Sequence, residues 1–290
     1  MNQTGPIRAI RHVAVLYHPK IQQSHDVAES VCRWLAEQQI TAWPALTWDE
    51  TAIRPRIPDM DLVIVLGGDG SMLRAARMAA GYDIPLLGIN MGRLGFLSEL
   101  SPSNWEAQLP HVLTGEYWIE QRLIIRARTW RGSDLIGDHL ALNDVVISRG
   151  SLARVVRLRT RIDGNLLTTY VADGVIVSTP TGSTAYALAS GGPILPPELR
   201  NMLLLPIAPH MSLNRPIVLA RDATVKIGVR TDHQAILTVD GQFEVELESG
   251  DEIEVSSADH TSLFIRLGSR AYFYDTLLAR MAPKPVADEY

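Results

Sequence analysis

"DLVIVLGGDGSML", residues 61–73, decides the fold that we expect for this chain. Its apolar first half predicts a buried strand, and its glycines lead into a helical pattern that ends at Gly81. Further buried strands are expected at 13–17 and 84–90. Ser24 is expected to cap the helix that follows the first strand. Because strands apolar throughout alternate with helices, we expect a Rossmann-like open parallel sheet, an α/β domain over residues 1–100.

The chain after residue 100 changes to many strands separated by Gly, Asn or Asp turns. Apolar and polar residues alternate clearly at 154–163, and we expect the arginines there to occupy the solvated face of a strand. This density of strands predicts an all-β, sandwich-like domain over residues 101–270. The tail, 271–290, turns helical again, and we expect this helix to return to the first domain.

The composition is that of a soluble globular protein, with 46% hydrophobic and 20% charged residues among 290. A net charge of -5 argues against a sequence-independent nucleic-acid partner, which needs a basic face. Cys32 is the only cysteine, which excludes an intrachain disulfide and a cysteine-based zinc site. Because neither a signal-peptide core nor a bilayer-length apolar stretch is present, we expect a cytoplasmic protein without membrane contact.

The lysines bear on phosphate chemistry because only Lys20, Lys226 and Lys284 occur. None of them precedes a serine or threonine as the Walker-type phosphate loop requires. Any phosphate chemistry must therefore rely on backbone amides, arginines and a metal ion.

Gly67, Gly68, Asp69 and Gly70 follow a predicted strand and begin a predicted helix, where open α/β sheets bind ligands. Glycines let the backbone approach a phosphate, and the helix dipole favours its charge. A carboxylate beside phosphates is repulsive unless it holds a magnesium ion or takes a proton from an attacking hydroxyl. The alternative is an ordinary strand-to-helix turn in which Asp69 caps the helix.

A second polar stretch, "STPTGSTAYALASGGP" at 178–193, follows an apolar strand. Its hydroxyls, glycine amides and Tyr186 suit ribose and phosphate oxygens, although such clusters also form plain surface loops. Asn143 and Asp144 precede another apolar run and can bind ribose hydroxyls or an adenine edge, or form a turn. Two stretches, "YVADG" at 170–174 and "VDGQ" at 239–242, are expected to be hairpin turns.

The sequence indicates neither a histidine-based metal site nor a nucleophile-elbow serine. The eight histidines are scattered without metal-ligand spacing. The nucleophile-elbow pattern Gly-x-Ser-x-Gly is absent from the sequence.

Taken together, these stretches resemble the NAD kinases of the ATP-dependent bacterial type, over residues 13–278. The resemblance rests on GGDG, Asn-Asp, "DGVIVSTPTGSTAY" (173–186), "SLNRPIV" (212–218) and "VDGQ", in that order. It implies transfer of the γ-phosphate of ATP to the 2'-hydroxyl of the adenosine ribose of NAD, which gives NADP. Magnesium or another divalent cation would be carried with ATP, without an assigned side-chain site. It also implies a homodimer or homotetramer.

The resemblance assigns roles to particular residues, with Asp69 as the base that deprotonates the ribose hydroxyl. The residues implied to bind NAD are Asp69, Gly70, Arg74, Asn143, Asp144, Arg154, Asp173, Thr184, Ala185, Tyr186, Ala187, Leu188, Ala189, Ala208 and Gln242. Those implied to bind the phosphates of ATP are Gly67, Gly68 and Gly70. The sequence departs from many members at Asp144, where they have Glu, and at Val171, where relatives often carry a basic or polar residue.

Two other interpretations use the same GGDG stretch. A lipid kinase of the diacylglycerol type shares it but needs an apolar acceptor cleft, which the polar residues 178–186 argue against. A dinucleotide-sensing module without catalysis is the other interpretation. Asp69 argues against it, because pure phosphate binding gains nothing from an added negative charge. The sequence leaves open the use of polyphosphate or NADH and feedback by NADPH.

Overall fold

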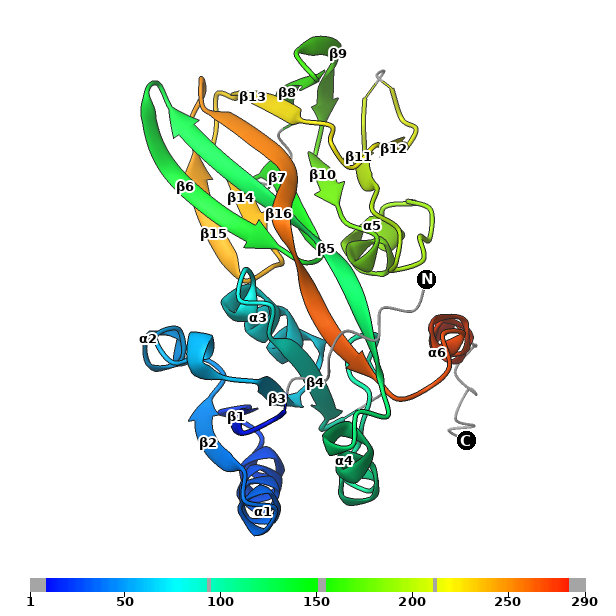
Figure 1. Ribbon diagram of the computed structural model, residues 1–290. Coiled ribbons are helices and arrows are strands. Elements are labelled where there is room, and N and C mark those ends of the chain that lie inside the picture. Colours follow the sequence, from blue (N-terminus) through cyan, green and yellow to red (C-terminus); the bar gives the residue numbers. More distant parts are fainter. Residues whose placement is uncertain (1–8, 93–94, 151–154, 211–212, 282–290) are drawn as a thin grey trace, which may run out of the picture. The chain divides into compact units, whose positions relative to one another are not determined.

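The structure is a computed structural model, and it describes residues 9–92, 95–150, 155–210 and 213–281. The chain divides into two compact units (Figure 1). An α/β unit comprises the described residues within Met1–Met78, Ile84–Glu120 and Phe264–Tyr290. A β-rich unit comprises the described residues within Ala79–Asp83 and Gln121–Leu263. No helix of the described part of the chain is long and apolar enough to span a membrane.

A parallel sheet with the strand order β2-β1-β3-β4 forms the centre of the α/β unit, as predicted (Figure 1). Its strands are β1 (His12–Tyr17), β2 (Thr41–Leu46), β3 (Leu62–Gly67) and β4 (Pro85–Asn90). Its helices are α1 (Gln22–Glu37), α2 (Glu50–Ile53), the 3-10 turn η1 (Ile57–Asp59), α3 (Asp69–Ala79), α4 (Trp105–Leu113) and α6 (Tyr272–Met281). Strand β3 is buried along its whole length, which explains its unbroken apolar sequence.

The helices of this unit bury apolar residues against the sheet. Val31 and Leu35 of α1 join one apolar cluster with Trp105 and Leu109 of α4. The C-terminal helix α6 belongs to this unit, as the sequence predicted, and its Phe273 ring lies 6.0 Å from that of Phe96.

The ends of two helices test the capping predictions. Helix α3 ends at Ala79, and Gly81 follows with a φ of +86°, so the predicted stop is confirmed. The prediction that Ser24 caps α1 is wrong, because Ile21 occupies the cap position. The Ser24 hydroxyl instead donates to the carbonyls of Ile21 and His18, at 2.6 and 2.9 Å. It therefore ties the helix to the preceding loop.

The β-rich unit is a two-sheet sandwich, as predicted. One sheet has the order β12-β11-β10-β7-β14-β15. In the other, β16, β13, β8 and β9 are neighbours in that order, and β5 pairs with β16 and β6. The strands of the first sheet are β7 (Asp144–Arg149), β10 (Gly174–Ser178), β11 (Met202–Ile207), β12 (Ile217–Leu219), β14 (Ala235–Val239) and β15 (Phe243–Leu247). Those of the second are β5 (Trp118–Arg131), β6 (Asp134–Ala141), β8 (Val156–Ile162), β9 (Asn165–Ala172), β13 (Val225–Arg230) and β16 (Glu252–Arg266).

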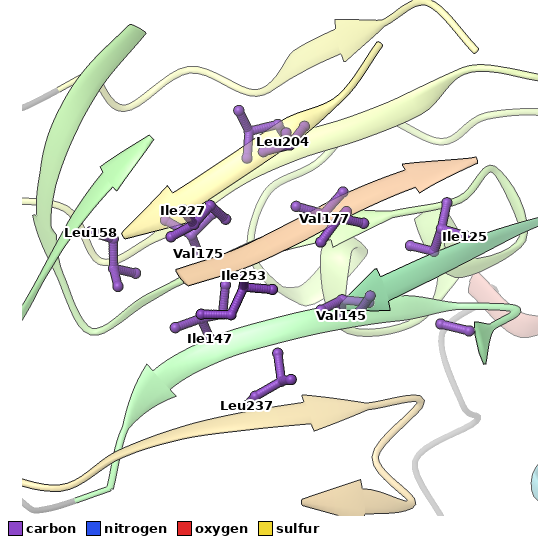
Figure 2. Packing of buried hydrophobic residues seen from close by; sticks show 14 of the residues in the cluster. Ile125, Val145, Ile147, Leu158, Val175, Val177, Leu204, Ile227, Leu237 and Ile253 are labelled. Carbon is purple, nitrogen blue, oxygen red and sulfur yellow. The ribbon is translucent and has the colours of Figure 1, made fainter. Parts of the chain in front are cut away.

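The core of the sandwich lies between the two sheets, and Figure 2 shows side chains from both of them converging on it. The labelled members are Val145, Ile147, Val175, Val177, Leu204 and Leu237 from one sheet, and Ile125, Leu158, Ile227 and Ile253 from the other. The arginines Arg157 and Arg159 of β8 are exposed, so the predicted alternation along this strand is confirmed.

The two predicted hairpin turns differ in outcome. Val239 pairs with Phe243 across β14 and β15, so the hairpin at 239–242 is confirmed. The hairpin expected at 170–174 is wrong. Strand β9 pairs with β8 in one sheet, whereas β10 pairs with β7 and β11 in the other. Asp173 therefore lies where the chain crosses from one sheet to the other.

Candidate active site

The GGDG stretch lies where the sequence places it, at the carboxyl end of β3 and the start of α3. Gly68 and Gly70 are exposed. Gly67 is buried, and a Cβ there would lie 2.7 Å from the Ser71 Cβ, so only glycine fits without movement. Backbone N–H groups at the start of an 11-residue helix favour a bound anion at this point.

Asp69 is half-buried, and its carboxylate is held by a neighbouring loop. The N–H of Phe96 donates to Oδ2 at 3.1 Å, and the N–H of Leu97 donates to Oδ1 at 3.2 Å. Both oxygens of the carboxylate are thus held by backbone amides of the same loop. The arrangement fixes the direction of a group suited to proton abstraction.

Gly95 makes this contact possible. A Cβ at Gly95 would lie 2.6 Å from the Asp69 Cγ and 2.8 Å from Oδ2. Our sequence reasoning missed the 95–97 loop, although Gly88 within the apolar strand at 84–90, and Gly92 and Gly95 after it, signal close backbone approach.

Arg74 lies on α3, one turn beyond Asp69, and its guanidinium is paired. Its Nη1 lies 2.6 Å from Oε1 of Glu50, and its Cζ lies 5.2 Å from the centre of the Trp48 ring. These partners come after β2, so the side chain is held beside the carboxyl ends of neighbouring parallel strands. Its predicted phosphate contact stays a prediction.

In the β-rich unit, Asn143 and Asp144 lie at the start of β7, held by the carboxylate of Asp240. The N–H groups of Asn143 and Asp144 donate to Asp240 Oδ1 at 2.8 and 3.2 Å, and that of Leu142 donates to Oδ2 at 3.1 Å. In return, the Asp240 N–H donates to the Asp144 carbonyl at 2.9 Å. Sequence reasoning treated Asp240 only as a turn residue and missed this role.

Asp144 is buried, with only 5% of the residue exposed. Its pKa is raised from 3.8 to about 7, first because burial penalises the charged form and second because of the nearby charge of Asp240. Near neutral pH the Asp144 carboxyl group is therefore protonated in a large fraction of the molecules, and there it can donate a hydrogen bond.

The hydroxyl-rich stretch is an ordered structure packed on the same end of the sheet. Thr179 donates its backbone N–H to the Asn143 carbonyl at 2.9 Å and its hydroxyl to the Leu142 carbonyl. A Cβ at Gly182 would lie 2.5 Å from the Asn143 carbonyl carbon, so the loop crosses Asn143 where only glycine fits. The buried Arg122, another residue that sequence reasoning missed, donates to the Thr181 hydroxyl at 3.3 Å.

The predicted pocket residues 184–189 follow this loop. Thr184 ends the 3-10 turn η2 (Thr181–Thr184), and Ala185 leads into the short helix α5 (Tyr186–Ala189). Tyr186 is 46% exposed, Ala187 is buried, and Leu188 and Ala189 complete the helix. Gln242 lies in the turn between β14 and β15, two residues after Asp240. Asn143, Asp144, the 178–184 loop and the 240–242 turn therefore meet at one end of the six-stranded sheet.

Asp173 and Ala208 lie at the opposite end of β10 from this group. Asp173 and Thr179 are six residues apart on an extended strand, which corresponds to about 20 Å. The Asp173 carboxylate pairs with Arg149, whose Nε lies 2.8 Å from Oδ1. Ala208 is exposed, with a φ of +44°. Arg154 lies outside the described residues.

Two family models match this chain. The ATP-NAD kinase N-terminal domain matches residues 37–117, and the ATP-NAD kinase C-terminal domain matches residues 142–267. An NAD kinase of Chloroflexus aurantiacus is 40% identical over 272 residues, covering 94% of this chain and 99% of that relative. One of Heliobacterium modesticaldum is 39% identical over 269 residues, covering 90% and 95%.

Solved structures agree. A yeast NADH kinase complexed with NADH has the same fold, with a TM-score of 0.80 at 23% identity, covering 96% of this chain and 90% of that chain. An Archaeoglobus fulgidus NAD kinase in complex with ATP has a TM-score of 0.75 at 26% identity, covering 92% and 97%. Since models of both halves and curated relatives across most of its length agree, this chain belongs to the NAD kinase family, whose reaction is the ATP-dependent phosphorylation of NAD to NADP.

Proposed function

We propose that Asp69 is the general base of this reaction, and that the acceptor is the 2'-hydroxyl of the adenosine ribose of NAD. The supporting observation is the pair of hydrogen bonds from the Phe96 and Leu97 amides, which hold the Asp69 carboxylate between two exposed glycines. As the bond from the ribose oxygen to the γ-phosphorus forms, Asp69 takes the hydroxyl proton and ADP leaves.

The phosphates of ATP are proposed to lie against Gly67, Gly68 and Gly70. The exposed backbone of Gly68 and Gly70 lets phosphate oxygens approach closely, and the start of α3 favours their charge. Arg74 of this helix is paired with Glu50, which comes after β2. It is proposed to contact a phosphate oxygen from that position.

A divalent cation such as magnesium is proposed to arrive with ATP. The described residues contain no group of three or more His, Cys, Asp or Glu side chains that could hold a metal ion. We propose that phosphate oxygens and water supply most ligands of this ion, and that Asp69, which lies among the glycines, is the nearby carboxylate. Such an ion neutralises charge on the triphosphate.

NAD is proposed to bind at the end of the six-stranded sheet described above. Asn143 and Asp144 would contact ribose hydroxyls or the adenine edge, and a protonated Asp144 supplies a donor there. Thr184, Ala185, Tyr186, Ala187, Leu188, Ala189 and Gln242 are proposed to line the same site. Gly70 and Arg154 are proposed as further NAD contacts; Arg154 lies outside the described residues.

A homodimer or homotetramer is part of the proposal. Asp173 and Ala208 are separated from Asn143 by the length of β10, about 20 Å. We propose that they contact NAD bound by a second copy of the chain. Cross-linking or light scattering of the purified protein, with and without NAD, tests the assembly.

The experiment for the base compares the wild type with Asp69→Asn, which has almost the same shape. With NAD, ATP and magnesium, the wild type should form NADP, and the variant should form it at least about 100-fold more slowly while binding NAD normally. Normal turnover by the variant contradicts the assignment. Parallel reactions with NADH or polyphosphate define the acceptor and donor range.

A further inference from the structure

Arg266, the last residue of β16, carries a charge in the interior of the α/β unit. Its side chain is among the largest fully buried ones in the structure, with 0% exposure. An ionised group in such a place is costly unless it is paired and hydrogen-bonded. Its partners therefore indicate what the residue is retained for.

Two carboxylates neutralise it. The Glu120 Oε2 lies 2.9 Å from both Nε and Nη2 of Arg266, and the Glu99 Oε2 lies 3.2 Å from Nη1. The Tyr272 hydroxyl donates to the other oxygen of Glu120 at 2.6 Å, and its ring lies 4.5 Å from the Arg266 Cζ. Burial lowers the pKa of Arg266, but Glu120, Tyr272 and Glu99 outweigh it and the net shift is upward.

The remaining donors of the guanidinium are directed at one short segment of backbone. Nη2 donates to the Phe96 carbonyl at 3.1 Å, and Nη1 lies 3.4 Å from the carbonyls of both Leu97 and Ser98. Glu99 directly follows this segment, and its Oε1 accepts the N–H groups of Leu267 and Gly268 at 2.9 and 2.8 Å. The end of the segment is therefore tied to the backbone that follows Arg266.

This is the segment that holds the proposed base. The N–H of Phe96 binds Asp69 while the C=O of Phe96 binds Arg266, and Leu97 makes the same two connections. Only one peptide segment separates the guanidinium from the Asp69 carboxylate. A movement of the segment of a few tenths of an ångström therefore moves both amide donors together.

A purely stabilising role explains this arrangement less well. Buried ion pairs contribute little net stability, because desolvation offsets their attraction, and apolar replacements are often as stable. Two carboxylates alone would satisfy the charge of Arg266. The additional hydrogen bonds from the guanidinium to three consecutive carbonyls fix the position of residues 96–98.

We propose that Arg266 is a positioning residue for Asp69, acting through the Phe96–Ser98 backbone. The inference rests on the proposed role of Asp69 as general base. It assigns to β16 and α6, which supply Arg266 and Tyr272, a part in aligning the reacting carboxylate.

The test uses Arg266→Lys, which keeps the charge between Glu99 and Glu120 but cannot form the same set of hydrogen bonds to the carbonyls. Displacing a catalytic group by about 1 Å costs on the order of 100-fold in rate, so we expect kcat to fall by about 10- to 100-fold. KM values for NAD and ATP should stay within about twofold, because no substrate contact is removed.

The same substitution is then made in the Asp69→Asn background. If Arg266 acts through the carboxylate, Arg266→Lys should lower the residual kcat of Asp69→Asn by less than about twofold, while its effect on Tm persists. Val31→Ala, at a fully buried position of α1, is the matched control. It should lower Tm and leave kcat unchanged.

The outcomes separate the two claims. Full turnover by Asp69→Asn overturns the proposed base. Suppose instead that Asp69→Asn has a low kcat, and that Arg266→Lys lowers kcat by the same factor in the Asp69→Asn background as in the wild type. This result overturns the positioning role of Arg266 and leaves the assignment of Asp69 as base intact. If Arg266→Lys does not fold, Tyr272→Phe replaces it, since it removes the hydroxyl bond to Glu120 and keeps the ring. A kcat for Tyr272→Phe equal to that of the wild type then counts against the proposal.

Discussion

Replacing Gly95 with alanine tests the Asp69 site with a single methyl group. The added Cβ would lie 2.6 Å from the Asp69 Cγ and 2.8 Å from Oδ2, whereas unbonded carbon atoms rest at about 3.5 Å or more. The carboxylate must therefore move by about 1 Å or rotate away from the Phe96 and Leu97 amides. A shift of this size predicts a fall in kcat on the order of 100-fold.

The fold should survive this change, because the obstructing atoms belong to a short side chain that can turn. NADP formation is followed at saturating NAD and ATP, and Tm is measured on the same samples. Gly92→Ala is the matched control, since a Cβ at Gly92 meets no atom within 4 Å. A Gly95→Ala variant that turns over within about twofold of wild type would refute the reasoning, as would an equal loss in Gly92→Ala.

Three further predictions concern the β-rich unit. Because the folded protein keeps the proton of Asp144 up to about pH 7 while the unfolded chain loses it near 3.8, stability falls as pH rises through this window. Asp144→Asn should remove this fall in stability. Urea unfolding at several pH values should then give the variant a higher free energy of unfolding than the wild type, by a difference that grows toward pH 7 to the order of a few kcal/mol. Asp240→Ala leaves three backbone N–H groups without their acceptor and should lower the free energy of unfolding by about 3 kcal/mol or more; a loss below about 1 kcal/mol contradicts the role of Asp240. Gly182→Ala places a Cβ 2.5 Å from the Asn143 carbonyl carbon, which cannot turn away, so unfolding free energy should drop by about 1–3 kcal/mol and NAD affinity with it; unchanged calorimetric titration of NAD argues against that contact.

The parts of the fold that follow from local pattern were predictable. Strand β3 is buried on both faces, so its sequence had to be apolar throughout, and the parallel sheet followed from that. Gly81 takes a positive φ after α3, as a helix-ending glycine does.

One error arose where the partner of a residue is remote, and the other where a local hydrogen bond competes with capping. Asp173 was expected in a hairpin, because turn residues do not reveal which sheet the next strand joins. Ser24 has the residue type of a cap, but its hydroxyl is committed to the His18 and Ile21 carbonyls.

The site was only partly predictable, because the partners of its residues are remote in the sequence. Asp69 stood out because its carboxylate is out of place among phosphate-binding glycines. The amides that hold it come from Phe96 and Leu97, 27 and 28 residues later. The acceptor for Asn143 is Asp240, 97 residues away. No local periodicity encodes contacts of this range.

The most direct test of the account is a single-turnover measurement with Asp69→Asn. Enzyme in excess over NAD is mixed with ATP and magnesium, and NADP is quantified after rapid quenching, with NAD affinity measured separately by calorimetry. The account predicts that NAD affinity is unchanged within about threefold and that the rate of the chemical step falls by about 100- to 10,000-fold. A chemical step within about fivefold of wild type would contradict it.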